Sequence, residues 1–181
     1  NWIQSGTDDP AMIDPMEMVH ASEQGRLGMS NGPYLEATFS AAGGGDAFVS
    51  GQALVAKSGK VRAHVRVQCP NWFDIDTVFV MINGKVAEQL QFTRDQNADM
   101  FSDDVLKFDR TLDIVLTEDS HVVVVAGHRT ETLGDVMGPY GGKQHPAALT
   151  NPVFIDVDGN GFQPNKDTLG FPLPVKFGRQ K

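Results

Sequence analysis

Apolar and polar residues alternate with a period of two along much of the chain. Residues 61–69 carry an apolar side chain at every odd position and a polar one at every even position. This pattern predicts a half-buried β-strand with one face in water. Residues 105–116 alternate in a similar way, and Arg110 interrupts their apolar face, so we expect a bend or bulge near it. Residues 122–125 are continuously apolar, which is typical of a central strand covered on both faces.

Turn residues divide these runs into separate strands. Asn83-Gly84 is the strongest short hairpin signal, and it separates an expected strand at 77–82 from one at 85–92. Weaker strand patterns occupy residues 34–39 and 152–157. Glycine-rich loops are expected at residues 41–45, 138–142 and 159–161. Because no alternation of strands with helices is visible, the sequence predicts a mostly β fold, an immunoglobulin-like antiparallel β-sandwich.

One helix is expected before the strands, over residues 15–24. Asp14 is a good N-cap, and Pro15 suits the first helical position. Glu17 stands three residues after the cap, where its side chain can reach back to the Asp14 N–H. Gly25 suits the left-handed conformation that ends a helix. The apolar stripe is narrow and consists of Met16, Met18 and Val19. We therefore expect this helix to pack on the edge of something larger.

Composition narrows the class of protein. The 181 residues (19.7 kDa) suit one domain with an appendage, and 40% hydrophobic with 21% charged residues is typical of a folded globular chain. The net charge of −8 disfavours nucleic acid as a partner, because an acidic surface repels phosphates. No apolar run approaches the roughly 20 residues of a membrane helix, so we expect no membrane insertion.

The most specific local pattern is an acidic loop near the C-terminal end. Oxygen ligands stand at its first, third and fifth places (Asp156, Asp158, Asn160), and a glycine follows where a calcium loop turns sharply. Phe162 would offer its carbonyl oxygen, and Asp167 takes the twelfth place. The alternative is a strand that runs into a glycine-rich turn with Asx hydrogen bonds. No cofactor is expected from the strand-and-turn interpretation, and calcium is the one cofactor that the loop pattern would add.

Other residues suggest weaker hypotheses. His128, Glu131 and His145 lie in or near loops and could surround a metal in a self-contained hydrolase, although their spacing matches no metal motif. Trp72 could stack on a sugar ring from a loop, but a tryptophan that anchors the core is the expected role. Cys69 closes an alternating strand and is expected to be a buried structural thiol. The scattered aspartates, Asp74 and Asp76 among them, are expected on a solvated rim.

Several segments agree in order with one known family. They are residues 25–35 (GRLGMSNGPYL), 65–74 (VRVQCPNWFD), 80–84 (VMING) and 150–159 (TNPVFIDVDG). Together they resemble PHP-type metallohydrolases of the carbaryl-hydrolase and microcin-processing (CehA/McbA-like) branch, over about residues 14–176. In that family the first segment follows the last helix of the catalytic barrel, and the others belong to a C-terminal β-sandwich.

The resemblance implies a division of the chain and a role for it. Residues 1–27 would form a segment and helix at the junction with an upstream PHP-type barrel, and residues 28–181 the sandwich. The family's metal ligands begin with an H-x-H motif, which this sequence lacks, so no ligand of that active site can be assigned. The expected function is that of a non-catalytic accessory domain with a structural, cleft-bordering or assembly role, homo-oligomerisation included. The alternative is a calcium-stabilised binding or adhesion module of an extracytoplasmic protein, periplasmic or extracellular.

Overall fold

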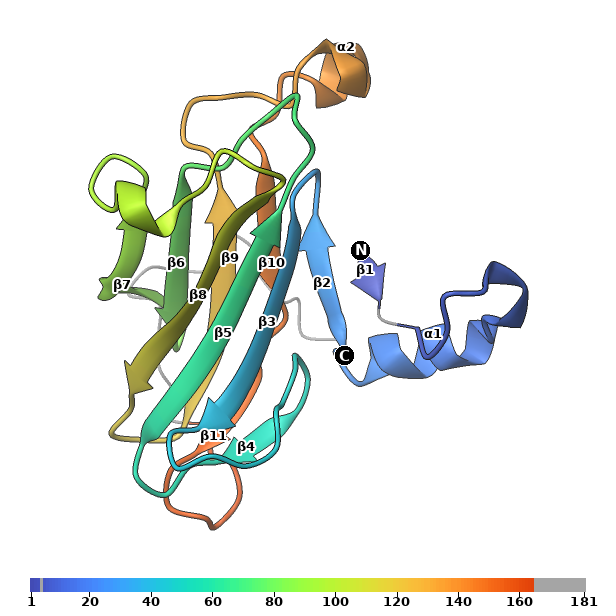
Figure 1. Cartoon of the computed structure of the whole chain (residues 1–181). Coiled ribbons are helices and arrows are strands. Elements are labelled where there is room, and N and C mark those ends of the chain that lie inside the picture. The colour runs from blue at the N-terminus through green and yellow to red at the C-terminus, as the bar shows by residue number, and fades with distance from the viewer. Residues whose placement is uncertain (4, 165–181) are drawn as a thin grey trace, which may run out of the picture.

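The chain folds as a mostly β sandwich of two sheets, as the alternating pattern predicts (Figure 1). The structure is a computed structural model that describes residues 1–3 and 5–164. In Figure 1 the smaller sheet lies in front of the larger one, with the strands of both running steeply up or down the picture. The immunoglobulin-like assignment of this sandwich stays a prediction.

The larger sheet is centred on one strand, β9. Its strands are β1 (Trp2–Ile3), β2 (Leu27–Ser30), β4 (Ala53–Val55), β6 (Thr77–Ile82), β7 (Lys85–Thr93), β9 (Ser120–Gly127), β10 (Ala147–Thr150) and β11 (Val153–Asp156). β9 pairs with β6 along one edge, and along the other it pairs with β10 and then β11. β10 continues through β2 to β1, whereas β11 continues to β4 in a parallel pairing. Beyond β9 the sheet therefore divides into two branches, one through β10 and one through β11.

The smaller sheet contains three antiparallel strands. They are β3 (Tyr34–Ala41), β5 (Lys60–Gln68) and β8 (Leu106–Val115), with β5 in the centre. The expected irregularity in β8 is present at a different residue. Its pairing with β5 slips between Val67 and Gln68, so Lys107 rather than Arg110 is the extra residue. The slip places Lys107 and Phe108 next to each other as buried residues.

Side chains from both sheets form one core between them. Phe39 and Phe108 from the smaller sheet are at most 1% exposed, and Val80 and Val124 from the larger sheet are fully buried. β9 shows a correction to the sequence analysis: its residues alternate between buried and half-buried, so only one of its faces is in the core. Its outer apolar residues, such as Val123, are half-buried because strands border β9 on both edges, while no layer formed by the described residues covers that face.

The predicted hairpin and loops follow from backbone chemistry. Asn83 and Gly84 adopt positive φ angles of 51° and 76°, which asparagine and glycine tolerate best, and they join β6 to β7. The loop expected at 138–142 contains a short helix, α2 (Gly138–Gly141), at the top of Figure 1. Three short 3₁₀ helices complete the described elements: η1 (Pro10–Met12), η2 (Ala98–Met100) and η3 (Asp135–Met137).

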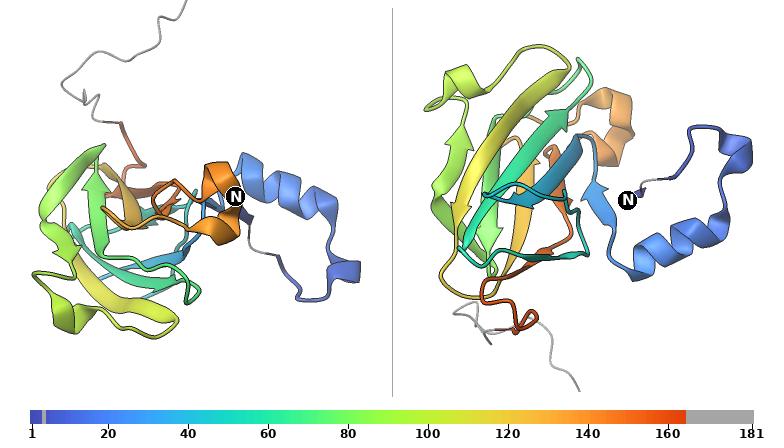
Figure 2. Two further views of the ribbon diagram at one scale, coloured as in Figure 1. Left: turned by 90° about the horizontal axis from the view of Figure 1, so that it is seen from above. Right: turned by 60° about the horizontal axis from the view of Figure 1, so that its bottom comes forward.

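The N-terminal helix forms where it is expected, as α1 (Pro15–Glu23). The Asp14 side chain caps it by accepting a hydrogen bond from the Met16 N–H at 2.9 Å. Glu17 does not complete the expected capping box, because its carboxylate accepts from the Gly6 N–H at 3.0 Å and thereby closes residues 6–17 into a loop. Both views of Figure 2 show this loop and α1 projecting away from the sheets. We call residues 5–24 the arm.

Candidate functional site

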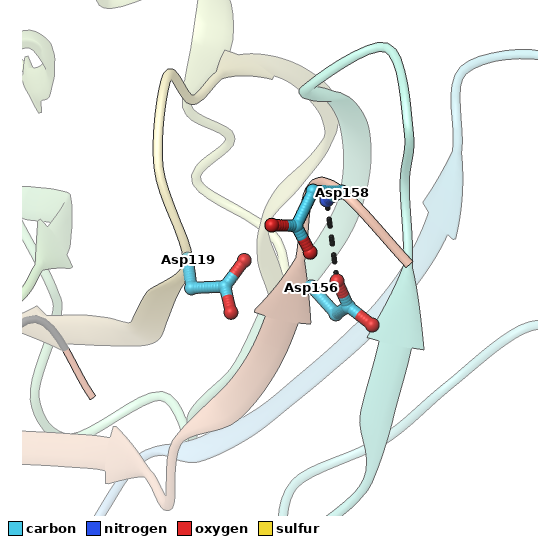
Figure 3. Close-up of side chains that lie close together, drawn as sticks. All are labelled: Asp119, Asp156 and Asp158. Carbon is cyan, nitrogen blue, oxygen red and sulfur yellow. Dashed lines mark hydrogen bonds between the residues drawn. The ribbon is translucent and has the colours of Figure 1, made fainter. Parts of the chain in front are cut away.

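Three aspartates gather at one end of the sandwich, where β11 ends beside the loop that leads into β9. Asp119, Asp156 and Asp158 each offer a carboxylate oxygen, and these oxygens lie within 4.8 Å of one another. Figure 3 shows Asp119 reaching across from its own loop towards Asp158. Among the described residues this is the one group of acidic, histidine or cysteine side chains with the geometry of a metal site.

Asp156 accepts the most backbone hydrogen bonds in the cluster because the chain curls around it. It is the last residue of β11 and only 3% exposed. Its carboxylate accepts backbone N–H hydrogen bonds from Asp158, Gly159 and Gly161 at 3.2, 2.6 and 2.8 Å. Burial by itself raises the pKa of Asp156, but the hydrogen bonds from Gly159, Gly161 and Asp158 outweigh it and lower this pKa below its ordinary value.

Asp119 joins the cluster from another part of the sequence. Its two carboxylate oxygens accept N–H hydrogen bonds from Val157 at 2.9 Å and Gln163 at 2.7 Å. Asp119 therefore ties the loop after β11 to the loop before β9. The motif search missed Asp119 because it lies 37 residues before Asp156 and only strand pairing brings the two together.

Among the described residues, the structure brings two of the five predicted calcium ligands into the carboxylate cluster. Asp156 and Asp158 come together as predicted. Asn160 hydrogen bonds to Asp158 through its backbone N–H at 3.1 Å and its side-chain amide at 2.7 Å. The Phe162 ring packs edge-on against Phe154, with 5.0 Å between ring centroids. Asp167 lies outside the described residues. Asx hydrogen bonds of the predicted alternative are thus present together with the carboxylate cluster.

Oxygen ligands in this arrangement suit a hard divalent cation. Calcium binds six to eight carboxylate, carbonyl and water oxygens, and three converging carboxylates supply a strong negative field for it. Without a cation the carboxylates repel one another, and the N–H donors offset part of this repulsion. The fit of donor type and spacing makes the cluster a candidate calcium site.

His128, Glu131 and His145 also come together, but as a hydrogen-bonded turn. The Glu131 N–H donates to His128 Nδ1 at 2.8 Å, while His128 Nε2 lies 3.4 Å from the Glu131 carboxylate. His145 Nδ1 lies 2.7 Å from the Glu131 backbone oxygen rather than near its carboxylate. Within the described residues these three side chains form no metal cluster. Their observed contacts hold the 128–131 turn against the 145 loop.

Two aspartates of the expected solvated rim belong to ion pairs. Asp76 is 7% exposed and accepts from Arg129 Nε at 2.8 Å, so its assignment to the rim is wrong. Burial raises the pKa of Asp76, but hydrogen bonds from Thr77 and Arg129 bring it below its ordinary value. Asp74 accepts from Arg94 at 3.0 Å and lies 3.5 Å from the buried Lys107 amine. The alternating pattern could not reveal these pairs, since they join separate loops.

Trp72 and Cys69 differ in how well the sequence predicted them. Trp72 is 49% exposed, so its expected role as a core anchor is wrong, and the neighbouring Phe73 is buried in its place at 4%. Cys69 is a buried free thiol, as predicted. Burial raises the pKa of Cys69 to about 11, so this thiol is a poor nucleophile at neutral pH.

A cavity of about 730 Å³ lies between the arm and the sandwich. Trp2 and Tyr34 line it from β1 and β3, and Glu17 and Arg26 line it from the arm side.

No helix within the described ranges, 1–3 and 5–164, has the length and apolarity needed to cross a membrane.

No family model, curated protein or solved structure matches this chain.

Proposed function

We propose that this chain is a non-catalytic accessory β-sandwich domain that packs beside a PHP-like metal-dependent hydrolase barrel through its arm. The observation that carries the proposal is the unpartnered apolar stripe of the arm. Met12, Met16 and Val19 are 71%, 53% and 43% exposed, whereas Ala21 on the opposite side of α1 is 4% exposed. Met16 and Val19 lie on α1 and Met12 on the preceding η1, and we call these three residues the stripe of the arm. Exposed apolar side chains grouped in this way mark a surface that another structure covers.

Two further observations support a partner on this side of the molecule. The arm projects away from the sheets (Figure 2), and no described residue buries the side chains of Met12, Met16 and Val19. The cavity of about 730 Å³ beneath it, lined by Glu17, Arg26 and Glu36, could receive a few side chains of an adjoining module. In this arrangement the sandwich braces the barrel and borders its substrate cleft, and the reactive groups belong to the barrel.

Two measurements test the proposal: the coding sequence upstream of Asn1, and the rate of amide hydrogen exchange in α1. We expect that sequence to encode a barrel with an H-x-H motif. In the longer protein the α1 amides should exchange much more slowly than in the 181-residue chain, because packing against the barrel suppresses helix opening. The buried strand β5 provides the control, since its exchange should be the same in both proteins. The absence of an H-x-H barrel, or equal exchange of α1 in both proteins, would contradict the proposal.

A second candidate function, a calcium-stabilised binding module, is favoured by the Asp119–Asp156–Asp158 cluster. Two independent features support it: the first and third ligand positions of the sequence motif converge, and Asp119 joins them from a separate loop. In this candidate the cation would tie the loop after β11 to the loop before β9, as Asp119 already does through hydrogen bonds. Its role would be structural.

Thermal unfolding with calcium or with chelator tests this candidate. Calcium at about 100 times its dissociation constant should raise the free energy of unfolding by about 2.7 kcal/mol. The variant Asp119→Asn should lose most of this gain, whereas Asp113→Asn, an exposed aspartate on β8, should keep it. Equal melting temperatures with calcium and with chelator would eliminate the candidate without affecting the accessory-domain proposal.

A further inference from the structure

Both tryptophans of the chain line one hollow of about 350 Å³. Trp2 belongs to the edge strand β1, and Trp72 to the loop that follows β5. Seventy residues separate them in sequence, so the fold brings them to the same hollow. Its other lining residues are Asn1, Ser30, Asn31, Gly32, Pro70, Phe73 and Met137.

Each indole is held in place while half of it stays in water. Trp2 and Trp72 are 50% and 49% exposed. Trp2 packs edge-on against Tyr34 with 5.2 Å between ring centroids, and Trp72 packs edge-on against Phe73 at 6.2 Å. Exposing so much aromatic surface costs free energy that burial would recover. Two fixed, half-exposed indoles in one hollow therefore indicate a surface kept for a ligand.

The hollow lies on a rigid floor. The Asn31 side chain donates to the His145 carbonyl at 2.9 Å and accepts from the Ala147 N–H at 2.8 Å, which ties this loop to β10. A Cβ added at Gly32 would lie 2.7 Å from Leu133 Cδ2 and 2.8 Å from Phe73 Cζ, so the backbone sits directly on the core. A preformed surface of this kind binds with little ordering cost.

The polarity of the hollow points to an uncharged ligand. In a chain with 21% charged residues and a net charge of −8, no Asp, Glu, Lys, Arg or His side chain is among the described residues that line it, and its one charged group is the terminal ammonium of Asn1. The Ser30 and Asn31 side chains already bond to backbone groups. Neither indole N–H donates a hydrogen bond to another described residue.

We propose that this hollow binds a neutral saccharide, whose ring stacks on the indoles of Trp2 and Trp72. A sugar ring offers an apolar C–H face to an aromatic ring and hydroxyl groups to its edge, which matches two indoles with free N–H donors. A charged ligand would find no side chain of opposite charge here, and a fully apolar one would offer no acceptor to the two N–H groups. The volume lies at the lower end of the range for small-molecule sites, about 300 to 1,000 Å³, so a stretch of one or two sugar rings fits.

Titration calorimetry with soluble neutral oligosaccharides tests the inference. Cellohexaose, xylohexaose, mannohexaose and chitohexaose serve as probes for the intact 181-residue chain. We expect at least one probe to bind. The variants Trp72→Ala and Trp2→Ala should each weaken it about tenfold or more, because each removes one stacking surface. Trp72→Phe keeps an aromatic ring and should weaken binding less than Trp72→Ala.

Tyr140→Ala is the matched control, because Tyr140 is an 88% exposed aromatic residue outside the lining of the hollow. This variant should bind the probe as the wild type does. Near-ultraviolet circular dichroism and melting temperature establish that each variant is folded. Lack of binding by any probe to folded wild type overturns the inference, and so does equal binding by Trp72→Ala. Neither result bears on the packing of the arm against a barrel, so the two proposals fail separately.

Discussion

The sandwich and the arm both carry an apolar stripe, but they use it differently. In β5 every odd residue from Val61 to Val67 is at most 1% exposed, because the inner face of the larger sheet covers it. In the arm, Met12 and Met16 are more than half exposed, although α1 is capped and hydrogen-bonded like any stable helix. The local signals for strand and helix are therefore satisfied equally in both regions. The regions differ because the apolar face of β5 packs against another sheet, whereas the apolar residues of the arm stay exposed.

This difference shows what hydrophobic patterning can predict. An apolar stripe predicts that one face of an element is buried. It does not predict whether residues of the same chain or of another protein bury that face. In the sandwich the strands of the facing sheet supply the cover, whereas no described residue covers the stripe of the arm. Stability of the isolated chain should therefore depend strongly on the first region and weakly on the second. Four measurements test this contrast.

The largest effect is expected in the core. Phe108 is 1% exposed and packs against Phe101 and Phe92 with ring centroids 5.3 and 6.2 Å away. Phe108→Ala removes this buried ring and leaves a cavity, which should lower the free energy of unfolding by about 3–5 kcal/mol. Denaturant unfolding measures this difference. Phe108→Leu, which keeps most of the volume, should cost clearly less; equal losses would mean that ring packing is not the cause.

The joint between the two regions should show the next largest effect. Gly51 has a φ of +82°, and a Cβ there would lie 1.9 Å from the Gln24 carbonyl oxygen at the end of α1. Gly51→Ala therefore combines backbone strain with a clash, and we expect a loss of about 1–3 kcal/mol. Gly44→Ala is the control, since Gly44 has a similar φ of +89° and open space around its Cβ. If both variants lose the same stability, the arm does not press on Gly51 in solution.

The acidic end of the sandwich should show a smaller, pH-dependent effect. The pKa of Asp156 is lowered in the folded chain, so its ionised form stabilises the fold above the ordinary value of 3.8. That contribution is lost as the pH falls below about 3.8 through the folded-state pKa. Asp156→Asn should therefore flatten the decline in stability at acid pH, measured by denaturant unfolding from pH 6 to pH 2 (roughly the range over which carboxylates titrate). Asp46→Asn, on an exposed loop, should leave the decline unchanged.

Sequence reasoning recovered the elements whose signals are local. The Asn83-Gly84 turn, the alternation of β5 and the Asp14 cap each depend on residues within one element, and each is present. Sequence reasoning failed at positions where a residue distant in sequence determines the local conformation or side-chain contact. The bulge of β8 falls at Lys107, which is buried beside Asp74, and Glu17 turns to Gly6 instead of to its own cap. A hydrogen-bond partner or salt-bridge partner from another segment outweighs the local pattern at these positions.

The candidate site divides in the same way. Asp156 and Asp158 were predictable because a calcium loop places its ligands at fixed short spacings. Asp119 was not, since strand pairing between β9 and β11 brings it to the cluster. The hollow with Trp2 and Trp72 depends on the pairing of β1 with β2. A strand of two residues is too short to give a recognisable sequence pattern, so this pairing could not be predicted.

The smallest effect on stability is expected for the stripe of the arm. Met16→Gln keeps a long, unbranched side chain with good helix propensity and removes only apolar surface that is 53% exposed. We expect a change of less than about 0.5 kcal/mol in the free energy of unfolding of the isolated chain. Ala21→Gln, on the buried side of the same helix, should cost about 1–3 kcal/mol because it overfills a packed site. A loss above about 1 kcal/mol for Met16→Gln that grows with protein concentration would mean that a second copy of the chain covers the stripe, and the barrel would no longer be needed to explain it.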